Sequence, residues 1–260
     1  MGRIVEKNQP CNSCGSSDAK QVYEDGSSFC FSCRKPTHAP REGVQVMINN
    51  EFDPVDTWGP SLKEIKEEFA SRGFKERNIF KQVSQHYGVK VSYDMDGNID
   101  SHYYPYFKED DLVGYKIRKL PKDFTSVGKV RGGLFGQQLF NGGKRLVITE
   151  GELDAMAVQS AWYKRYKTFY PVVSLRSASS VKDLIEEREW IRNFDEVILW
   201  LDNDDAGREA AKEAARIIGY DKVKVAKSSE KDASDLWIKD PDKVLKTIYD
   251  STDYTPAGIL

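Results

Sequence analysis

The chain has 260 residues and a formal net charge of -2, with 39% apolar, 31% charged and 12% aromatic residues. This is the composition of a globular protein with one large domain or two smaller ones. No window approaches ~18 uninterrupted apolar residues, which excludes a transmembrane helix, and the N-terminal "MGRIVEKNQP" lacks the apolar core of a signal peptide. We therefore expect a soluble, cytoplasmic protein.

All four cysteines lie within the first 33 residues, as two Cys-x2-Cys pairs separated by fifteen residues: Cys11, Cys14, Cys30 and Cys33. This spacing fits the ligands of a zinc ribbon. Four thiolates make a closed, structural site, so one zinc ion would fold the module without taking part in chemistry. A redox pair is the alternative, but a redox Cys-x-x-Cys would need a βαβ setting that is missing here.

Residues 20–30 predict a short hairpin with Asp25-Gly26 at its turn. The exposed hairpin could contact single-stranded DNA, or its aromatic side chains could pack against the zinc knuckles. The side chains in question are Tyr23, Asp25, Ser27, Ser28, Phe29 and Phe31. We place the zinc-binding ribbon at 1–38 and a flexible linker at 39–58, because this stretch has no sustained period and is rich in proline.

Residues 61–73 have the apolar spacing of a helix. Ser61 is the expected N-cap, with Glu64 completing a capping box, and Gly73 is the expected C-terminal stop. A second short helix is expected at 75–83.

Residues 88–120 alternate apolar and polar side chains, with turn signals at 96–98 and 110–111, which predicts a small antiparallel unit. The segment 116–131 carries six basic residues against one acid, Asp123, and therefore suits a polyanionic ligand. We take 59–143 as a basic subdomain. The basic residues are Lys116, Arg118, Lys119, Lys122, Lys129 and Arg131.

The remainder reads as an α/β domain at 144–250, followed by a tail at 251–260. Apolar runs rich in Val, Ile and Leu alternate with helix-like stretches, which is typical of a parallel sheet flanked by helices. The expected strands are 145–149, 170–175, 196–201 and 222–226, and the expected helices are 152–166, 180–193 and 206–218.

Acidic residues follow three of these strands: Glu150 follows the first, Asp202 and Asp204 the third, and Asp232 and Asp235 the fourth. The carboxyl ends of parallel strands meet at one edge, where ligands of open α/β sheets bind. Carboxylate oxygens grouped in this way suit Mg²⁺ or Mn²⁺.

A simpler interpretation is available for one acid of the cluster. Asp204 or Asp205 could cap the helix that begins near residue 206, since Asp is a favoured N-cap. The combination of acids after three separate strands nevertheless favours a metal site.

The motifs "VITEGELDAM", "LWLDNDDAGREAA" and "KDASDL" resemble the TOPRIM domain shared by topoisomerases and primases. The resemblance implies that Glu150 is a general acid/base or a metal ligand, and that Asp202 and Asp204 bind magnesium. Asp232 matches a further acidic position of primases. No role is assigned to Glu152, Asp154 and Asp205.

With "CNSCGSSD", "GLFG" and "NGGKRLVITEGE", the chain from about residue 10 onward resembles the primase half of the bifunctional primase–helicases of tailed phages. This resemblance implies a DNA primase that makes short RNA primers on single-stranded DNA. It further implies ribonucleoside triphosphates as substrates, a structural zinc, and one or two catalytic Mg²⁺ or Mn²⁺ ions. A replicative helicase and a DNA polymerase are the implied partners, with no membrane, in the cytoplasm of a phage-infected bacterium.

In such primases two lysines contact nucleotide phosphates, and Lys116 and Lys122 match them, with Arg118 between. Arg72 matches an arginine for which a template contact is plausible. Any single lysine is usually only solvated, so the local basic density carries this expectation.

Where the best-known relatives have a template-reading histidine in the hairpin, this chain has Ser27, and with Asp25 it is a candidate template contact. No Gly-x4-Gly-Lys-Ser/Thr is present, so the chain is either a fragment of a primase–helicase or a stand-alone primase.

Two rival functions remain. A TOPRIM nuclease or topoisomerase would need a tyrosine nucleophile, for which Tyr103, Tyr104 and Tyr106 are candidates only by default. A non-catalytic zinc–TOPRIM scaffold of the recombination-mediator kind is the other rival, and the complete acid set and the basic run disfavour it. The histidines lack metal-ligand spacing, so we expect them to be surface or packing residues; they are His38, His86 and His102.

Overall fold

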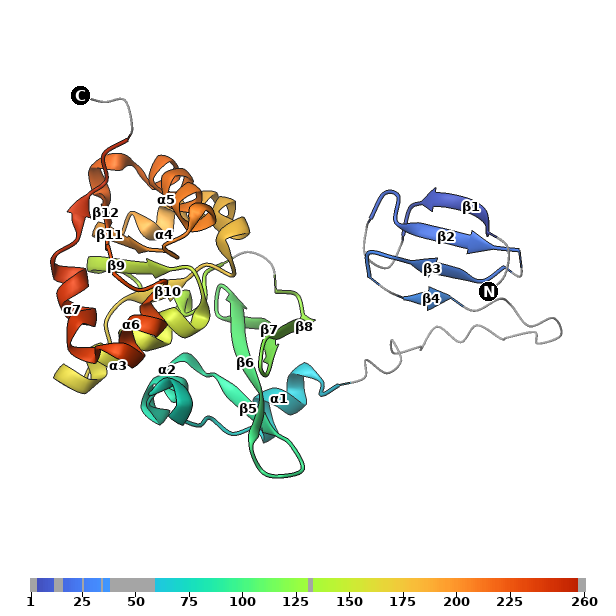
Figure 1. The fold of residues 1–260 in the computed structure, drawn as a ribbon, viewed down its shortest axis with the longest axis horizontal. Helices are drawn as coiled ribbons and strands as arrows, with labels where there is room; N and C mark the ends of the chain where they lie inside the picture. Colours follow the sequence, from blue (N-terminus) through green and yellow to red (C-terminus); the bar gives the residue numbers. More distant parts are fainter. Residues whose placement is uncertain are drawn as a thin grey trace. The chain divides into compact units, whose positions relative to one another are not determined.

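A computed structural model describes residues 4–11, 16–24, 26–33, 35–37, 59–130 and 133–256. The chain divides into two compact units, Met1–Asp56 and Thr57–Leu260 (Figure 1). The predicted linker, 39–58, lies outside the described residues. The finer domain limits given above stay predictions.

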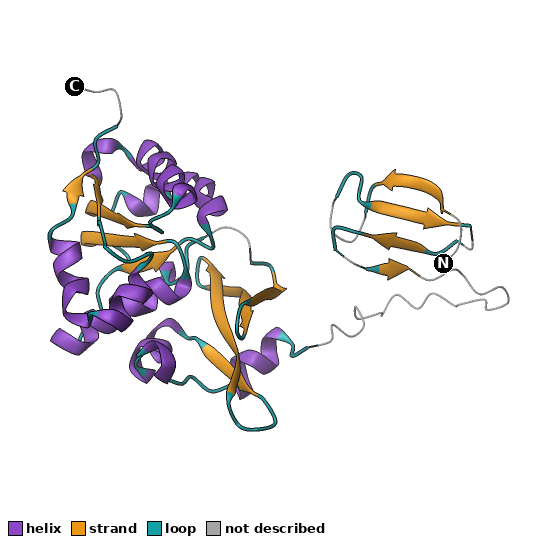
Figure 2. Cartoon of the chain, viewed as in Figure 1, coloured by secondary structure: helices purple, strands orange, loops and turns teal. Residues whose placement is uncertain are grey.

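The smaller unit is a four-stranded antiparallel sheet in the order β1-β2-β3-β4 (Figure 2). Its strands are β1 (Ile4–Gln9), β2 (Lys20–Tyr23), β3 (Ser28–Cys30) and β4 (Pro36–Thr37). The predicted hairpin is confirmed, since Lys20 pairs with Cys30, and Gly26 takes the positive φ of 78° that its turn requires. Strand β1 was not predicted, because its largely exposed side chains show no apolar alternation.

The larger unit begins with α1 (Leu62–Glu68), whose predicted capping box is confirmed. The Glu64 amide donates to Ser61 Oγ at 3.2 Å, and the Ser61 amide donates to Glu64 Oε2 at 3.3 Å. The helix ends before Gly73. The backbone of Phe69 is extended, and Ala70 forms an isolated β-bridge with Val91.

The second helix is displaced from its predicted range. Lys75–Arg77 form only a 3₁₀ turn, since Asn78 adopts a left-handed φ of 53°, and α2 (Lys81–Tyr87) follows. Gly88, with φ of 72°, ends this helix.

The predicted antiparallel unit is confirmed as a sheet in the order β5-β6-β7-β8. Its strands are β5 (Lys90–Tyr93), β6 (Ile99–Lys108), β7 (Asp111–Lys119) and β8 (Asp123–Gly128). The turns between the first three strands fall where the sequence signals them.

The predicted parallel sheet is confirmed with the order β10-β9-β11-β12, and β13 (Thr252–Asp253) adds an antiparallel edge that was not predicted. The parallel strands are β9 (Gly143–Thr149), β10 (Val172–Ser174), β11 (Phe194–Trp200) and β12 (Val223–Val225).

Of the helices expected around this sheet, α3 (Glu152–Tyr166) and α5 (Asp205–Ile218) are confirmed. The helix expected at 180–193 is instead a 3₁₀ stretch, Ala178–Ile185, followed by the short α4 (Arg188–Ile191). Serine hydroxyls compete for backbone hydrogen bonds at its start, where Ser180 Oγ accepts from the amides of Arg176 and Ser177. Further on lie α6 (Ala233–Lys239) and α7 (Pro241–Tyr249).

Both faces of the parallel sheet are covered. Alternate residues of β11 enter different cores: Ile198 and Trp200 pack with α3, α6 and α7, whereas Val197 and Leu199 pack with Ala178–Ile185 and α5. Figure 1 shows α4 and α5 on one side of the sheet and α3, α6 and α7 on the other. The α/β class is therefore confirmed.

In the part of the chain that the structure describes, no helix is long and apolar enough to cross a membrane.

Candidate active site at the carboxyl edge of the parallel sheet

Two neighbouring strands bring the first two carboxylates together. Thr149 at the end of β9 pairs with Trp200 at the end of β11, so Glu150 and Asp202 leave the sheet side by side. The Asp202 amide donates to Glu150 Oε2 at 3.3 Å. The expected meeting of these two segments at one edge is therefore observed.

Two more carboxylates join from helix starts. Asp154, in the first turn of α3, is buried and accepts from the Ser234 amide at 3.0 Å. Asp232 is the N-cap of α6 and accepts from the Asp235 amide at 2.7 Å. Burial, followed by the charge of Asp232, raises the pKa of Asp154 well above its usual value, and burial also raises the pKa of Asp232.

The cluster is electrostatically unfavourable without a cation. Burial and then the charge of Asp202 raise the pKa of Glu150. Lys231 balances part of this negative charge. Its Nζ lies 3.0 Å from Asp202 Oδ2 and 4.0 Å from Asp204 Oδ2. The hydrogen bond and charge of Asp202 raise the pKa of Lys231.

Asp204 satisfies both interpretations offered for it. Its Oδ1 accepts from the Gly207 amide at 2.9 Å as the N-cap of α5, while its Oδ2 faces Lys231. Asp205 has a fully exposed side chain paired with Arg208 at 2.5 Å. Asp205 therefore does not belong to the cluster.

Gly207 allows the acidic loop to close tightly onto α5. A Cβ atom at this position would lie 2.0 Å from the carbonyl oxygen of Asp202 and 2.8 Å from its carbonyl carbon. Only glycine fits such an approach, which explains why "DNDDAG" places glycine in the first turn of a helix.

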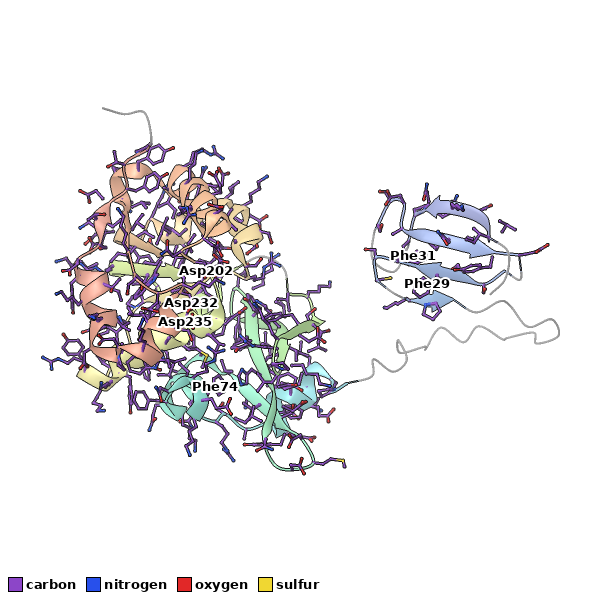
Figure 3. All side chains as sticks on the ribbon, viewed as in Figure 1. Phe29, Phe31, Phe74, Asp202, Asp232 and Asp235 are labelled. Atoms are coloured by element: carbon purple, nitrogen blue, oxygen red, sulfur yellow. The ribbon has the colours of Figure 1, made fainter. Side chains whose placement is uncertain are left out.

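A cleft of about 710 Å³ joins the acidic edge to the antiparallel sheet. Its acidic wall is lined by Glu150, Asp154, Asp202 and Asp232, and its basic wall by Lys116, Arg118 and Lys122. Figure 3 shows Asp202 and Asp232 on the side of the parallel sheet nearest to β6, β7 and β8. The structure thus brings three of the predicted acids, Glu150, Asp202 and Asp232, to one cavity with the predicted nucleotide-binding residues, whereas Asp204 does not line it.

The three basic residues differ in their surroundings. Lys116 Nζ is in an ion pair with Glu152 at 2.9 Å and donates to the carbonyl oxygen of Arg176 at 2.6 Å. Arg118 lies against the ring of Phe124, and Lys122 is exposed.

Glu152 and Tyr106 form a connection that the sequence did not reveal. Glu152 is only 4% exposed, and the Tyr106 hydroxyl donates to its Oε1 at 2.6 Å. Burial, followed by the charge of Glu152, raises the pKa of Tyr106 well above its usual value. The Tyr106 side chain is 1% exposed, so a DNA strand cannot reach its hydroxyl. The contact joins residues 46 positions apart, so no local pattern could have signalled it.

Arg72, a predicted template contact in the larger unit, does not line the cleft. Arg72 is exposed and donates to the carbonyl oxygen of Ser71 at 3.2 Å. Ser27, in the hairpin, accepts at its carbonyl from the Tyr23 amide at 2.9 Å, and Asp25 lies outside the described residues. Phe31 is 57% exposed.

The cysteine cluster fits a metal ion. The sulfur atoms of Cys11, Cys30 and Cys33 lie within 4.8 Å of one another, and those of Cys11 and Cys33 are 3.9 Å apart. A tetrahedral zinc with bonds of about 2.3 Å requires sulfur separations of roughly 3.8 Å. Cys14 lies outside the described residues.

Among the described residues, these thiols are the only set of three possible ligand atoms gathered so closely. The carboxylates of the acidic edge are more widely spaced. Magnesium is commonly held by one or two carboxylates together with water and substrate phosphates, so the spacing still suits that ion.

The Toprim-like family model matches residues 147–237, the segment that carries the acidic edge. The DNA helicase/primase of Enterobacteria phage T3 is 32% identical over 267 residues, which cover 96% of this chain and 44% of that protein. The chain thus spans less than half the length of this relative.

Two solved structures extend the likeness. The crystal structure of the primase fragment of the bacteriophage T7 primase-helicase is 30% identical, with a TM-score of 0.64, and the match covers 94% of this chain and 98% of that one. A structure of the T7 lagging-strand DNA polymerase with primase domains bound to an RNA/DNA hybrid and dTTP contains a chain that is 30% identical, with a TM-score of 0.63. That match covers 72% of this chain and 93% of the other.

A parallel sheet with an acidic carboxyl edge, joined to a basic antiparallel sheet, defines a Toprim-containing catalytic body. The chain belongs to the family of Toprim-type DNA primases.

Proposed function

We propose that the protein synthesises short RNA primers on single-stranded DNA by metal-dependent nucleotidyl transfer. The observation that carries this proposal is the cleft with one acidic and one basic wall. A cation bound to the acidic wall and side chains on the basic wall would together hold a nucleoside triphosphate. The family likeness supports the same activity.

Glu150, Asp202 and Asp204, assisted by Asp232, would hold one or two Mg²⁺ or Mn²⁺ ions. The ion pair between the Lys231 ammonium group and Asp202 supports a cation at this position. When bound, the ion would withdraw charge from the phosphates and favour ionisation of the attacking 3′-hydroxyl. Glu150, whose pKa is raised by burial, would serve as a further ligand or accept the hydroxyl proton.

Arg118 and Lys122 would hold the triphosphate from the opposite wall. Lys116 reaches the same cleft, but Glu152 already balances its charge. We therefore assign the larger share of phosphate binding to Arg118 and Lys122, and to Lys116 the additional task of fixing β7 against α3.

In the smaller unit, Cys11, Cys14, Cys30 and Cys33 would hold one structural zinc. Its hairpin, through Asp25 and Ser27, and Arg72 of the larger unit would contact template DNA.

A replicative helicase, fused or separate, and a DNA polymerase are the proposed partners. The phage T3 relative is a helicase/primase, and the T7 structure contains primase domains with a DNA polymerase. The proposed setting is the cytoplasm of a phage-infected bacterium.

The test uses the variants Asp202→Asn and Asp204→Asn, incubated with ribonucleotides, Mg²⁺ and a random library of single-stranded DNA. Each variant should lose at least about a hundredfold in labelled primer, because metal binding contributes several kcal/mol to the transition state. Asp205→Asn is the matched control, since its side chain points into solvent, and circular dichroism checks the fold.

Near-normal synthesis by Asp202→Asn would contradict the site assignment. An inactive wild-type protein that still binds single-stranded DNA would instead favour the scaffold function, and strand cleavage without nucleotides would favour a nuclease.

A further inference from the structure

Lys231 lies inside the acidic cluster, on the loop between β12 and α6. Its Nζ is 3.0 Å from Asp202 Oδ2 and 4.0 Å from Asp204 Oδ2. Its carbonyl oxygen accepts from the Asn203 amide at 2.7 Å, which ties the lysine's loop to the loop that carries both acids. The backbone on both sides of the ion pair is therefore fixed.

The cluster depends on this one ammonium group. Among the ion pairs of the described residues, Lys231 is the only partner of Asp202 and of Asp204. The other carboxylates nearby, Glu150, Asp154 and Asp232, add negative charge at the same edge. Partly buried carboxylates at such short range are costly unless a cation balances them.

We propose that Lys231 is a built-in counter-cation, which occupies the cation position of the acidic edge in the metal-free protein and leaves Asp202 when a divalent ion binds. The inference rests on the proposed metal site. A carboxylate oxygen that contacts both an ammonium and a divalent ion would hold two cations in mutual repulsion. Lys231 therefore competes with the metal and lowers its affinity.

The exposure and flexibility of the Lys231 side chain allow it to leave Asp202. It is 52% exposed, and a lysine stem is flexible, so the ammonium group can move away from Asp202 while the loop backbone keeps its bond to Asn203. Lys231 also lines the cleft that contains Arg118 and Lys122. A displaced ammonium group thus stays in the cavity proposed to receive the triphosphate.

The experiment measures Mn²⁺ binding to the full chain in the absence of nucleotide, by titration calorimetry and by electron paramagnetic resonance of the free ion. Lys231→Met should bind Mn²⁺ about tenfold more tightly than the wild type, because one competing charge is removed. Lys231→Arg, which keeps the charge, should stay within about twofold of the wild type. Lys227→Met is the matched control, since Lys227 is exposed on the same loop and does not line the cleft.

A second measurement follows thermal unfolding. Without metal, Lys231→Met should melt at a lower temperature than the wild type, and saturating Mn²⁺ should abolish the difference. If Lys231→Met does not fold, Lys231→Gln replaces it with a neutral polar side chain of similar length.

The outcomes separate the two proposals. Unchanged or weaker Mn²⁺ binding by the neutral variants, with normal binding by the wild type, would overturn the role of Lys231 and leave the metal site intact. Failure of the wild type to bind Mn²⁺ would overturn the proposed metal site itself, and the role of Lys231 with it.

Discussion

At the scale of single residues, several side chains at the acidic edge serve two purposes at once. Asp204 and Asp232 each cap a helix with one oxygen, and Asp204 keeps its second oxygen toward a cation. The cap position orients each carboxylate by a backbone hydrogen bond, so a residue that stabilises a helix also arrives at the site in a fixed orientation.

His102 is a packing residue in the core of the larger unit. It is 4% exposed, stacks on Phe74 with ring centres 3.9 Å apart, and its Nδ1 lies 3.1 Å from the Tyr104 hydroxyl. Burial lowers the pKa of His102 from 6.5 to about 4. Between these two pH values the unfolded chain binds a proton that the folded protein does not.

We expect the contribution of His102 to the unfolding free energy to be complete above pH 6.5 and to be lost as the pH falls toward 4, by roughly 3 kcal/mol. In His102→Gln, the loss of stability between pH 7 and pH 5 should be smaller than in the wild type. Urea unfolding at both pH values measures this difference. Equal losses would contradict the assignment.

His86, whose pKa is also lowered to about 4 by burial, titrates in the same range but is present in both proteins. The buried acids with raised pKa, Asp154 and Asp232, act in the opposite direction, because their contribution to the stability of the folded protein decreases as the pH rises. The contributions of His86 and of the buried acids are the same in the variant and the wild type, so they cancel in the comparison.

Local chemistry decided which residues could be predicted. The Ser61–Glu64 capping box and the acids of the "DNDD" motif are defined by neighbours in the chain. Lys231 was missed although it directly precedes Asp232, because a lysine beside an acid is the commonest solvated pair. Glu152 was left without a role because its partners, Lys116 and Tyr106, lie 36 and 46 positions away.

At the scale of secondary-structure elements, one polar connection joins the basic sheet to helix α3. Tyr106 of β6 and Lys116 of β7 both bind the carboxylate of Glu152 in the first turn of that helix. The side chains of Lys116 and Glu152 are 17% and 5% exposed, so their ion pair is little screened.

A double-mutant cycle with Lys116→Met and Glu152→Gln should give a coupling energy of about 1–3 kcal/mol, because each single variant leaves a partly buried polar partner unbalanced. The exposed pair of Lys164 and Asp242, with side chains 49% and 90% exposed, is the control and should give no more than about 0.5 kcal/mol. Denaturant unfolding supplies both values. A coupling energy as small as that of the control would show that the Lys116–Glu152 ion pair does not stabilise the fold.

Strands that are apolar on both faces were predicted, whereas exposed strands were missed, and so were α6 and α7, although these two helices bury apolar side chains. The four parallel strands were found because both of their faces are apolar, whereas β1 and β13 are largely exposed. The segment 180–193 has an apolar period of helical type, yet local serine bonding and the break before α4 divide it.

At the scale of the whole molecule, the two units differ in how they are stabilised. Among the described residues of the smaller unit, only Cys11 and Cys30 are buried apolar side chains, whereas the larger unit contains extensive cores. A sheet with so little apolar burial requires a metal cross-link to fold.

Removal of zinc by a strong chelator should therefore unfold the smaller unit alone. In calorimetry, the transition of the larger unit should move by less than ~2 °C, which is under about 1 kcal/mol for a unit of this size. Proteolysis should then cut within residues 4–37 first, and a colorimetric dye should detect one zinc per chain. Loss of the larger unit's transition on chelation would contradict the independence of the two units.

The register that pairs Thr149 with Trp200 also determines when the carboxylates meet. Glu150 and Asp202 are 52 positions apart, and Asp154 and Ser234 are 80 apart, so these groups approach only after long loops have closed. Until β9 and β11 pair, the carboxylate of Glu150 stays apart from those of Asp202 and Asp204. We expect the repulsion between Glu150 and these acids to arise only with that pairing, so an ion that relieves it should prolong the lifetime of the native state without hastening its formation.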